Sequence, residues 1–216
     1  MPSKYLIRSF DTDCAFHVFN RGVEKRKIFL DKQDYKMFVY YLFIYLANPE
    51  TIKVYYPNLP GTLKIANLYG ELDLLTFCLM PNHFHLQIQP KTVDSITKLL
   101  KQISNAYTKY FNEKYDRVGH LFQGRYKAAK INNDELNIHV HRYIHLNPMV
   151  ANLADTLEDY TYSSYQEYMN PGGVKNICNT ETFLSHFGGF KVYREFLMSQ
   201  VGDDEVSMKI GHLTID

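Results

Sequence analysis

The sequence has no tryptophan, few cysteines and no long apolar run, and the last two shortages each exclude a class of protein. Cys14, Cys78 and Cys178 are odd in number, widely spaced and free of a CxxC pair, which argues against a disulfide framework or a zinc knuckle. No apolar segment approaches the roughly 20 residues that span a bilayer, and the N-terminal MPSKYLIRSFDTD lacks the apolar middle of a signal peptide. We therefore expect a soluble, unexported protein with reduced thiols.

Apolar and aromatic residues, by contrast, are plentiful. Hydrophobic residues make up 45% of the 216 residues, with 18 tyrosines and 14 phenylalanines. This composition can bury a core in one domain or one and a half, which excludes disorder as the main state.

A local excess of positive charge is hidden by the net charge of +1. Three acidic residues lie between positions 91 and 130, against nine basic ones: Lys91, Lys98, Lys101, Lys109, Lys114, Arg117, Arg125, Lys127 and Lys130. Segregated positive charge favours a polyanionic partner, although a solvated helix face explains it about as well.

Hydrophobic periodicity predicts elements in the order β-α-β-β-α-β, followed by a further helix. We expect strands at 14–20, 72–80, 83–89 and 124–131, and helices at about 32–46 and 93–113. The further helix begins near Asn133 and is closed by Pro148. This order predicts an α+β, ferredoxin-like sandwich: a central antiparallel sheet with helices on one face and the other face open for a ligand.

The chain shows no internal repeat and no sharp domain boundary. We expect one catalytic domain at 1–170, with an irregular, proline-rich excursion near 48–70. Residues 171–216 are expected to form a C-terminal appendage with a short helix near 191–200 and an acidic tail.

Two histidines share one face of the strand HFHLQIQ. Alternation sends its apolar residues toward the helices, so His83 and His85 stand side by side on the predicted open face. Two imidazoles at i and i+2 on a strand can both bind one divalent cation. For an isolated HxH pattern, a pair of ordinary surface histidines is the more frequent explanation.

The helix that begins near Asn133 can supply the remaining chemistry. Tyr143 and Asn147 are separated by four residues and therefore share a face. An amide oxygen at Asn147 would complete a ligand set with the two histidines, leave metal positions open for phosphate and water, and place Tyr143 beside that phosphate. Without further information, a core tyrosine is the simpler interpretation. By composition alone, the third ligand could equally be His139, His141 or His145.

Several motifs resemble one known family. MPNHFHL at 80–86 resembles the MPNHxH signature of HUH single-strand nucleases, specifically the REP-associated tyrosine transposases, relatives of small insertion-sequence transposases. Other blocks agree in order: FHV at 16–18 with RG at 21–22, FQGRYK at 122–127, YIHLNP at 143–148, and DY and SSY between 159 and 165. The resemblance covers roughly residues 14–165; the excursion at 48–70 is longer than expected for the family, and the tail after 170 does not align.

The resemblance implies a role for each matching residue. His83 and His85 correspond to the metal ligands, Tyr143 to the nucleophile and Asn147 to the amide ligand. The implied activity is transposition through cleavage of single-stranded DNA, dependent on Mg or Mn, at hairpin or REP-like sequences, with a 5′-phosphotyrosine intermediate. A metal would assist because a free tyrosine, with a pKa near 10, is a poor nucleophile at neutral pH. The implied setting is the bacterial cytoplasm, and the protein would act as a monomer or homodimer.

We assign DNA binding to five basic residues: Arg21, Lys98, Lys101, Arg125 and Lys127. Phosphates supply affinity for such side chains, and a sheet face flanked by them suits a single strand. Arg125 and Lys127 are expected to share a strand face. Exposed strand charges without a ligand explain that pair about as well.

Two other functions stay open. The HxHxQ pattern at 83–87 also fits nucleotidyl transferases with a histidine nucleophile, for which Tyr143 would be dispensable. A catalytically idle DNA-binding protein could retain the fold, although the intact set of motif residues argues against it. Covalent attachment of the protein to a labelled single-stranded hairpin would separate these possibilities.

Overall fold

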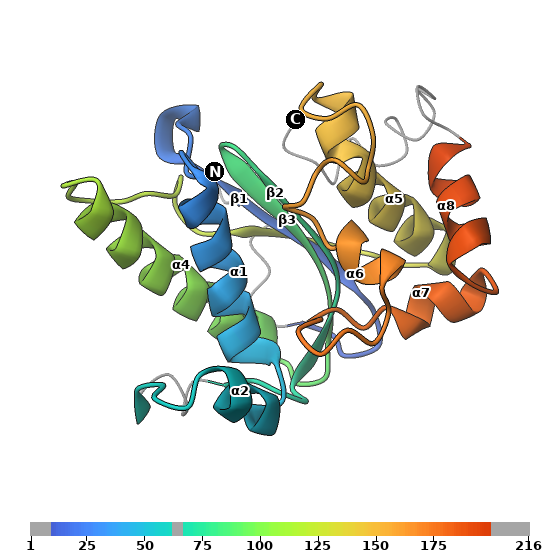
Figure 1. Cartoon of the computed structure of the whole chain (residues 1–216), viewed down its shortest axis with the longest axis horizontal. Helices are drawn as coiled ribbons and strands as arrows, with labels where there is room; N and C mark the ends of the chain where they lie inside the picture. The colour runs from blue at the N-terminus through green and yellow to red at the C-terminus, as the bar shows by residue number, and fades with distance from the viewer. Residues whose placement is uncertain (1–9, 62–66, 200–216) are drawn as a thin grey trace.

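A four-stranded antiparallel sheet forms the centre of the computed structural model, which describes residues 10–61 and 67–199 (Figure 1). Its strands, in the spatial order β2-β3-β1-β4, are β1 (Phe16–Arg21), β2 (Leu72–Met80), β3 (His83–Pro90) and β4 (Lys127–Lys130). This is the strand order of a ferredoxin-like sandwich. The predicted α+β fold is confirmed.

Helices α1 (Lys32–Leu46) and α4 (Ser95–Lys114) cover the first face of the sheet. α1 begins where the sequence predicts because Asp31 caps it, accepting hydrogen bonds from the backbone amides of Gln33 and Asp34. α4 buries a stripe at helical spacing: Ile96, Leu100, Ile103, Tyr107 and Phe111. These residues meet the apolar side of β3 in one continuous core.

The second face of the sheet is also covered, so the prediction that this face is open is wrong. It packs against α5 (Asp134–Val150), α6 (Tyr165–Met169), α7 (Glu181–His186) and α8 (Phe190–Met198). This second core contains Leu75, Cys78, Met80 and Ala129 from the sheet, with Val140, Ile144, Tyr165, Tyr168, Phe183, Tyr193 and Leu197 from the helices. The polar side of β3 therefore lies beneath a helix layer.

Three local predictions need correction. α5 continues past Pro148 to Val150, because a proline near the end of a helix removes only one of the last backbone hydrogen bonds. The proline-rich excursion contains α2 (Pro49–Tyr55), which begins after the capping residue Asn48. The last strand begins only at Lys127, because Gly124 turns the backbone at φ 76 and the Tyr126 hydroxyl is hydrogen-bonded to Thr97 on α4.

The segment after α5 runs along the outer edge of β2. The backbone amide of Leu79 donates to the Tyr162 carbonyl at 3.0 Å, and that of Ser164 donates to Phe77 at 2.9 Å. Further along, the amide of Asn179 donates to Leu74 at 2.8 Å. The predicted acidic tail lies outside the described residues. No helix in the described part of the chain is long and apolar enough to cross a membrane.

Candidate active site

Cross-strand pairing gathers the candidate residues on the second face of the sheet. Arg21 lies opposite His83, and Phe19 lies opposite both His85 and Lys127. Residues opposite one another in antiparallel strands point to the same side. The two histidines, the arginine and the lysine therefore share one polar surface, which we call the histidine face.

The hydrogen bonds of His83 fix its tautomer. Its Nδ1 lies 2.7 Å from Asn82 Oδ1, and the amide nitrogen of Asn82 donates to the Lys25 carbonyl at 3.3 Å. Since the amide oxygen can only accept, His83 Nδ1 carries the proton and donates it. The lone pair is then on Nε2, so this nitrogen is the one that can bind a metal ion.

His85 is oriented by a hydrogen bond to a third histidine, His17. Its Nδ1 lies 2.9 Å from His17 Nε2, and the two rings stack with centroids 5.1 Å apart. His85 Nε2 is buried without a hydrogen-bond partner among the described residues. Burial, followed by the neighbouring His83 and His17, lowers the pKa of His85 well below its usual value. The ring is therefore neutral, which is the form that binds a cation.

α5 places Tyr143 directly over these rings. Its centroid lies 5.4 Å from that of His85 and 5.9 Å from that of His17, in edge-on geometry. Asn147 follows one turn later and is buried on the side of the helix that meets the sheet. The structure thus brings His83, His85 and Tyr143 together. Asn147 lies one helical turn beyond Tyr143 on α5.

A buried polar network, which we call the clamp, fixes α5 to the sheet. The Tyr193 hydroxyl on α8 lies 2.9 Å from His141 Nε2 and 2.6 Å from His145 Nδ1. The other nitrogen of His141 bonds to Gln87 at 2.9 Å, and that of His145 bonds to Ser164 at 2.8 Å. His141 and His145, which the sequence left as possible ligands, thus occupy structural positions. Burial lowers the pKa of His145 to about 3.

The donor set fits a divalent cation, with two imidazoles rather than three. In the described part of the chain no three His, Cys, Asp or Glu side chains are grouped to hold a metal ion. Imidazole nitrogens at His83 and His85 would need oxygen ligands beside them, such as the Asn147 amide, water or phosphate. Hydrogen bonds that fix the far nitrogen of each ring are typical of metal-binding histidines. Metal binding stays a prediction.

Ion pairs neutralise much of the basic segment. Within residues 91–130 the paired lysines are Lys91 with Asp73, Lys98 with Glu71 and Asp94, Lys109 with Glu113, Lys114 with Asp31 and Asp34, and Lys130 with Asp11. No such pair within residues 10–61 and 67–199 engages Lys101, Arg125 or Lys127. Of the predicted DNA-binding residues in this segment, these three, rather than Lys98, carry the free positive charge.

The predicted DNA-binding residues divide between two faces. Arg21 and Lys127 lie on the histidine face, and Arg21 donates through Nε to Gln123 at 2.6 Å. Lys101 and Arg125 line a groove beside α4, on the other side of the sheet. The prediction that Arg125 and Lys127 share a strand face is wrong, because Arg125 precedes β4.

Comparison with known proteins finds similarity to one family. The sequence matches the family of IS200-like transposases over residues 62–147, a range that contains His83, His85, Tyr143 and Asn147. The resemblance to this family is confirmed. The family match supports a DNA-processing enzyme of the transposase class.

A solved structure shows the same fold. The structure of a REP-associated tyrosine transposase bound to a REP hairpin aligns with a TM-score of 0.54 at 15% sequence identity. The alignment covers 82% of this chain and 93% of that one. No curated protein sequence matches the chain.

Sequence reasoning gave no role to His17 or Tyr193. His17 alternates with Phe16 and Val18 in β1, so the same period-two argument that placed His83 and His85 would have placed it on the histidine face. Tyr193 had no such signal, since its partners are 48 and 52 residues away in the sequence.

Proposed function

We propose that this protein is a metal-dependent HUH transposase that cleaves and rejoins single-stranded DNA at hairpin or REP-like sequences. Tyr143 is the nucleophile and forms a 5′-phosphotyrosine intermediate. The observation that carries the proposal is the position of the Tyr143 ring, 5.4 Å from His85 on a shared polar face. Tyr143 also lies edge-on to His17, with the two ring centroids 5.9 Å apart.

Each residue has a distinct task in this mechanism. His83 and His85 would hold a divalent cation, Mg or Mn, with Asn147 as the amide ligand; when bound, the cation supplies positive charge that stabilises the phosphorane-like transition state. Tyr143 Oη attacks phosphorus and gives up its proton, the bond from phosphorus to the 3′ oxygen breaks, and that oxygen takes up a proton. The upstream DNA then leaves with a free 3′ hydroxyl, and the downstream DNA stays attached to Tyr143 through its 5′ phosphate. The phosphotyrosine bond retains the energy for rejoining.

Basic residues on the same face account for binding of the single strand. Arg21 lies opposite His83 in the sheet, where its guanidinium can contact the phosphate next to the scissile one. Lys127 lies two strands from His85, which corresponds to roughly 10 Å at the usual strand spacing. A DNA single strand bound to both Arg21 and Lys127 would cross the Tyr143 ring.

Trapping the intermediate tests this proposal. The protein is incubated with Mn and a hairpin that carries a single-stranded flank, labelled separately at each end, and the adduct is mapped by mass spectrometry. We expect one covalent adduct, on Tyr143, that retains the label on the 3′ side of the cut. An adduct on His83 or His85 would instead establish the histidine-nucleophile mechanism, and the absence of any adduct would favour an idle DNA-binding protein.

A further inference from the structure

A glutamine that has no task in the mechanism above is bonded to Arg21. The Nε atom of Arg21 donates to the side-chain oxygen of Gln123 at 2.6 Å. Gln123 belongs to the segment at 120–125, which passes beside the end of β1 and leads into β4. Gln123 is exposed and Arg21 is half-buried. The bond therefore lies at the surface, at the strand position opposite His83.

Backbone hydrogen bonds fix the positions of the two residues. The amide of Gln123 donates to the Arg21 carbonyl at 2.8 Å. The buried side chain of Asn20 spans the same junction. Its oxygen accepts from the amide of Arg21 at 2.9 Å, and its nitrogen donates to the Gly124 carbonyl at 3.2 Å. Because the backbone is already paired, only the two side chains lose freedom when Arg21 and Gln123 bond.

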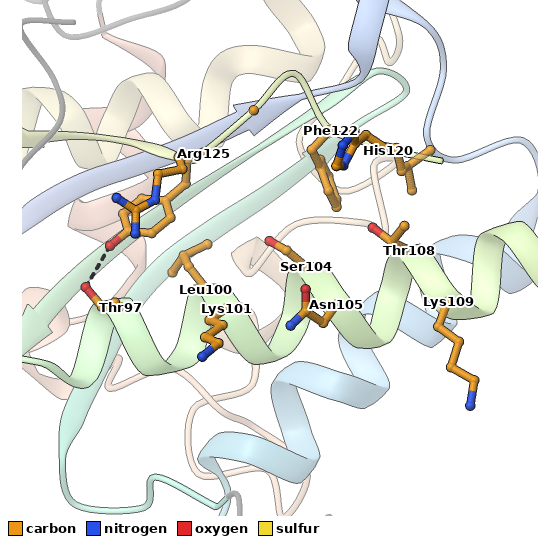
Figure 2. Close-up of a pocket in the computed structure, with 13 residues that line it drawn as sticks. Thr97, Leu100, Lys101, Ser104, Asn105, Thr108, Lys109, His120, Phe122 and Arg125 are labelled. Atoms are coloured by element: carbon orange, nitrogen blue, oxygen red, sulfur yellow. Dashed lines mark hydrogen bonds between the residues drawn. The ribbon is translucent and has the colours of Figure 1, made fainter. Parts of the chain in front are cut away.

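Side chains on this segment alternate between the two faces of the sheet. Phe122 forms an antiparallel bridge with Gly22 and packs against Phe84 in the first core. Figure 2 shows its ring among the residues that line the groove beside α4. Successive residues of an extended chain point to opposite faces, so Gln123 points to the histidine face, where Arg21 lies. Burial of Phe122 thus anchors the glutamine on the side of the proposed site.

The bond leaves both the charge and the outer edge of the guanidinium available. A guanidinium carries five N–H groups in a planar fork, and Gln123 takes the one on Nε. The terminal nitrogens remain for another acceptor, and phosphate matches two of their N–H groups side by side. An amide oxygen orients the arginine without cancelling its charge. Lys114, by contrast, is held and neutralised by the carboxylates of Asp31 and Asp34.

We propose that Gln123 is a positioning residue that holds the Arg21 guanidinium so that its terminal nitrogens bind a phosphate of the single strand beside His83. The identity of that strand rests on the proposed function. Arg21 and His83 are directly opposite in antiparallel strands, with Cβ atoms roughly 5 Å apart. Without Gln123 the long arginine side chain would have to be ordered when DNA binds, and this cost would weaken binding.

Binding measurements in EDTA test this inference without any cleavage. The probe is an unstructured oligo-dT, titrated by anisotropy at several salt concentrations. Gln123→Ala removes the anchor and keeps the charge of Arg21, whereas Gln123→Glu keeps an anchor and cancels the charge. The matched controls are Gln33→Ala and Gln33→Glu, at an exposed position in the first turn of α1. Circular dichroism melts check that every variant is folded.

We expect Gln123→Ala to bind oligo-dT about three- to tenfold more weakly with an unchanged salt slope, because Arg21 still contacts its phosphate but must first be ordered. Gln123→Glu should also bind more weakly, with its salt slope reduced by about 0.7, the value for one contact on a single strand. Both Gln33 variants should stay within twofold of the parent.

A double-mutant cycle connects the effect to Arg21. Arg21→Lys keeps a positive charge but has no Nε–H group for Gln123, so it should bind oligo-dT about as weakly as Gln123→Ala does. Adding Gln123→Ala to Arg21→Lys should then cost less than a further twofold. A merely structural role of Gln123 predicts instead that the two losses multiply.

An unchanged affinity of Gln123→Ala for oligo-dT, losses that multiply in the cycle, or a parent protein that does not bind oligo-dT would each overturn the inference. The proposed function has a separate outcome. A protein that shows the coupling between Arg21 and Gln123 but forms no adduct on Tyr143 with Mn and a flanked hairpin would contradict the mechanism and leave this inference standing.

Discussion

At the scale of single residues, the histidine face combines ligands with the side chains that orient them. His85 binds through one nitrogen to His17, and His83 through one nitrogen to Asn82, so the opposite nitrogen of each ring is directed by a hydrogen bond. Outer partners of this kind typically contribute 10- to 100-fold to metal affinity. Their loss should therefore be measurable without any loss of a ligand.

The first prediction concerns the cation. The double variant His83→Ala/His85→Ala should lose Mn binding in calorimetry while retaining its circular dichroism spectrum, because the metal ligands are not part of the apolar cores. His17→Ala should keep the ligands but bind Mn about tenfold or more weakly. If the double variant binds Mn as tightly as the parent protein, the ligand assignment fails.

The second prediction concerns Tyr143. Replacement by phenylalanine keeps the ring against His85 and removes only the hydroxyl. Adduct formation should fall below detection, with DNA and Mn affinities within about twofold of the parent. Binding is measured by anisotropy and calorimetry, and the adduct by gel. An adduct that persists in Tyr143→Phe would identify a different nucleophile.

At the scale of elements, α5 is positioned by side chains from other parts of the chain. The clamp joins α5 to β3 through Gln87, to the start of α6 through Ser164 and to α8 through Tyr193. The helix that carries the proposed nucleophile is thereby held in register with the strand that carries the proposed ligands. The C-terminal helices are thus part of what positions the site.

The third prediction tests this role. Tyr193→Phe leaves two buried imidazole nitrogens without their shared hydroxyl, which should cost on the order of 1–3 kcal/mol of unfolding free energy, or several degrees in Tm. The cleavage rate should fall while DNA affinity is maintained. Tyr165→Phe is the matched control, because its hydroxyl bonds to Glu158 outside the clamp. Equal effects from both variants would remove any special role for the clamp.

The sequence predicts the sheet and the helices on its first face well, and it predicts the helix layer on the second face poorly. α1 begins at a capping signal, and β2 and β3 follow from alternation around Pro81 and Asn82; these signals are local. The helices α6, α7 and α8 have between five and nine residues, too short for a clear period, and form because their aromatic side chains are buried against α5. Neither the helices that cover the second face of the sheet nor the clamp can be predicted without those long-range contacts.

At the scale of the whole molecule, stability is coupled to pH through the C-terminal region. Burial raises the pKa of Glu167 to about 7, although the backbone amides of Ile177 and Cys178 donate to its carboxylate at 2.9 and 2.8 Å. The folded protein therefore binds this proton more tightly than the unfolded chain does. Its contribution to stability is present below the unfolded pKa, near 4.3, and is lost as the pH rises through about 7.

The fourth prediction follows from this loss of stability with rising pH. Between about pH 5 and 8 the parent protein should lose on the order of 1–3 kcal/mol of stability that Glu167→Gln does not lose, since glutamine keeps an acceptor for both amides. Thermal melts at several pH values measure the difference. Parallel pH profiles for the two proteins would show that Glu167 does not titrate in this range.

The hydrogen bonds along the outer edge of β2 have a consequence for association. An exposed strand of nine residues would offer its unpaired amides and carbonyls to any other strand, including the same edge of a second copy. Tyr162, Ser164 and Asn179 occupy that edge from within the chain. The other edge belongs to β4, which has four residues and a lysine at each end. The sheet is thus protected against aggregation and domain exchange by its own C-terminal segment, and a chain truncated before residue 160 should associate through β2.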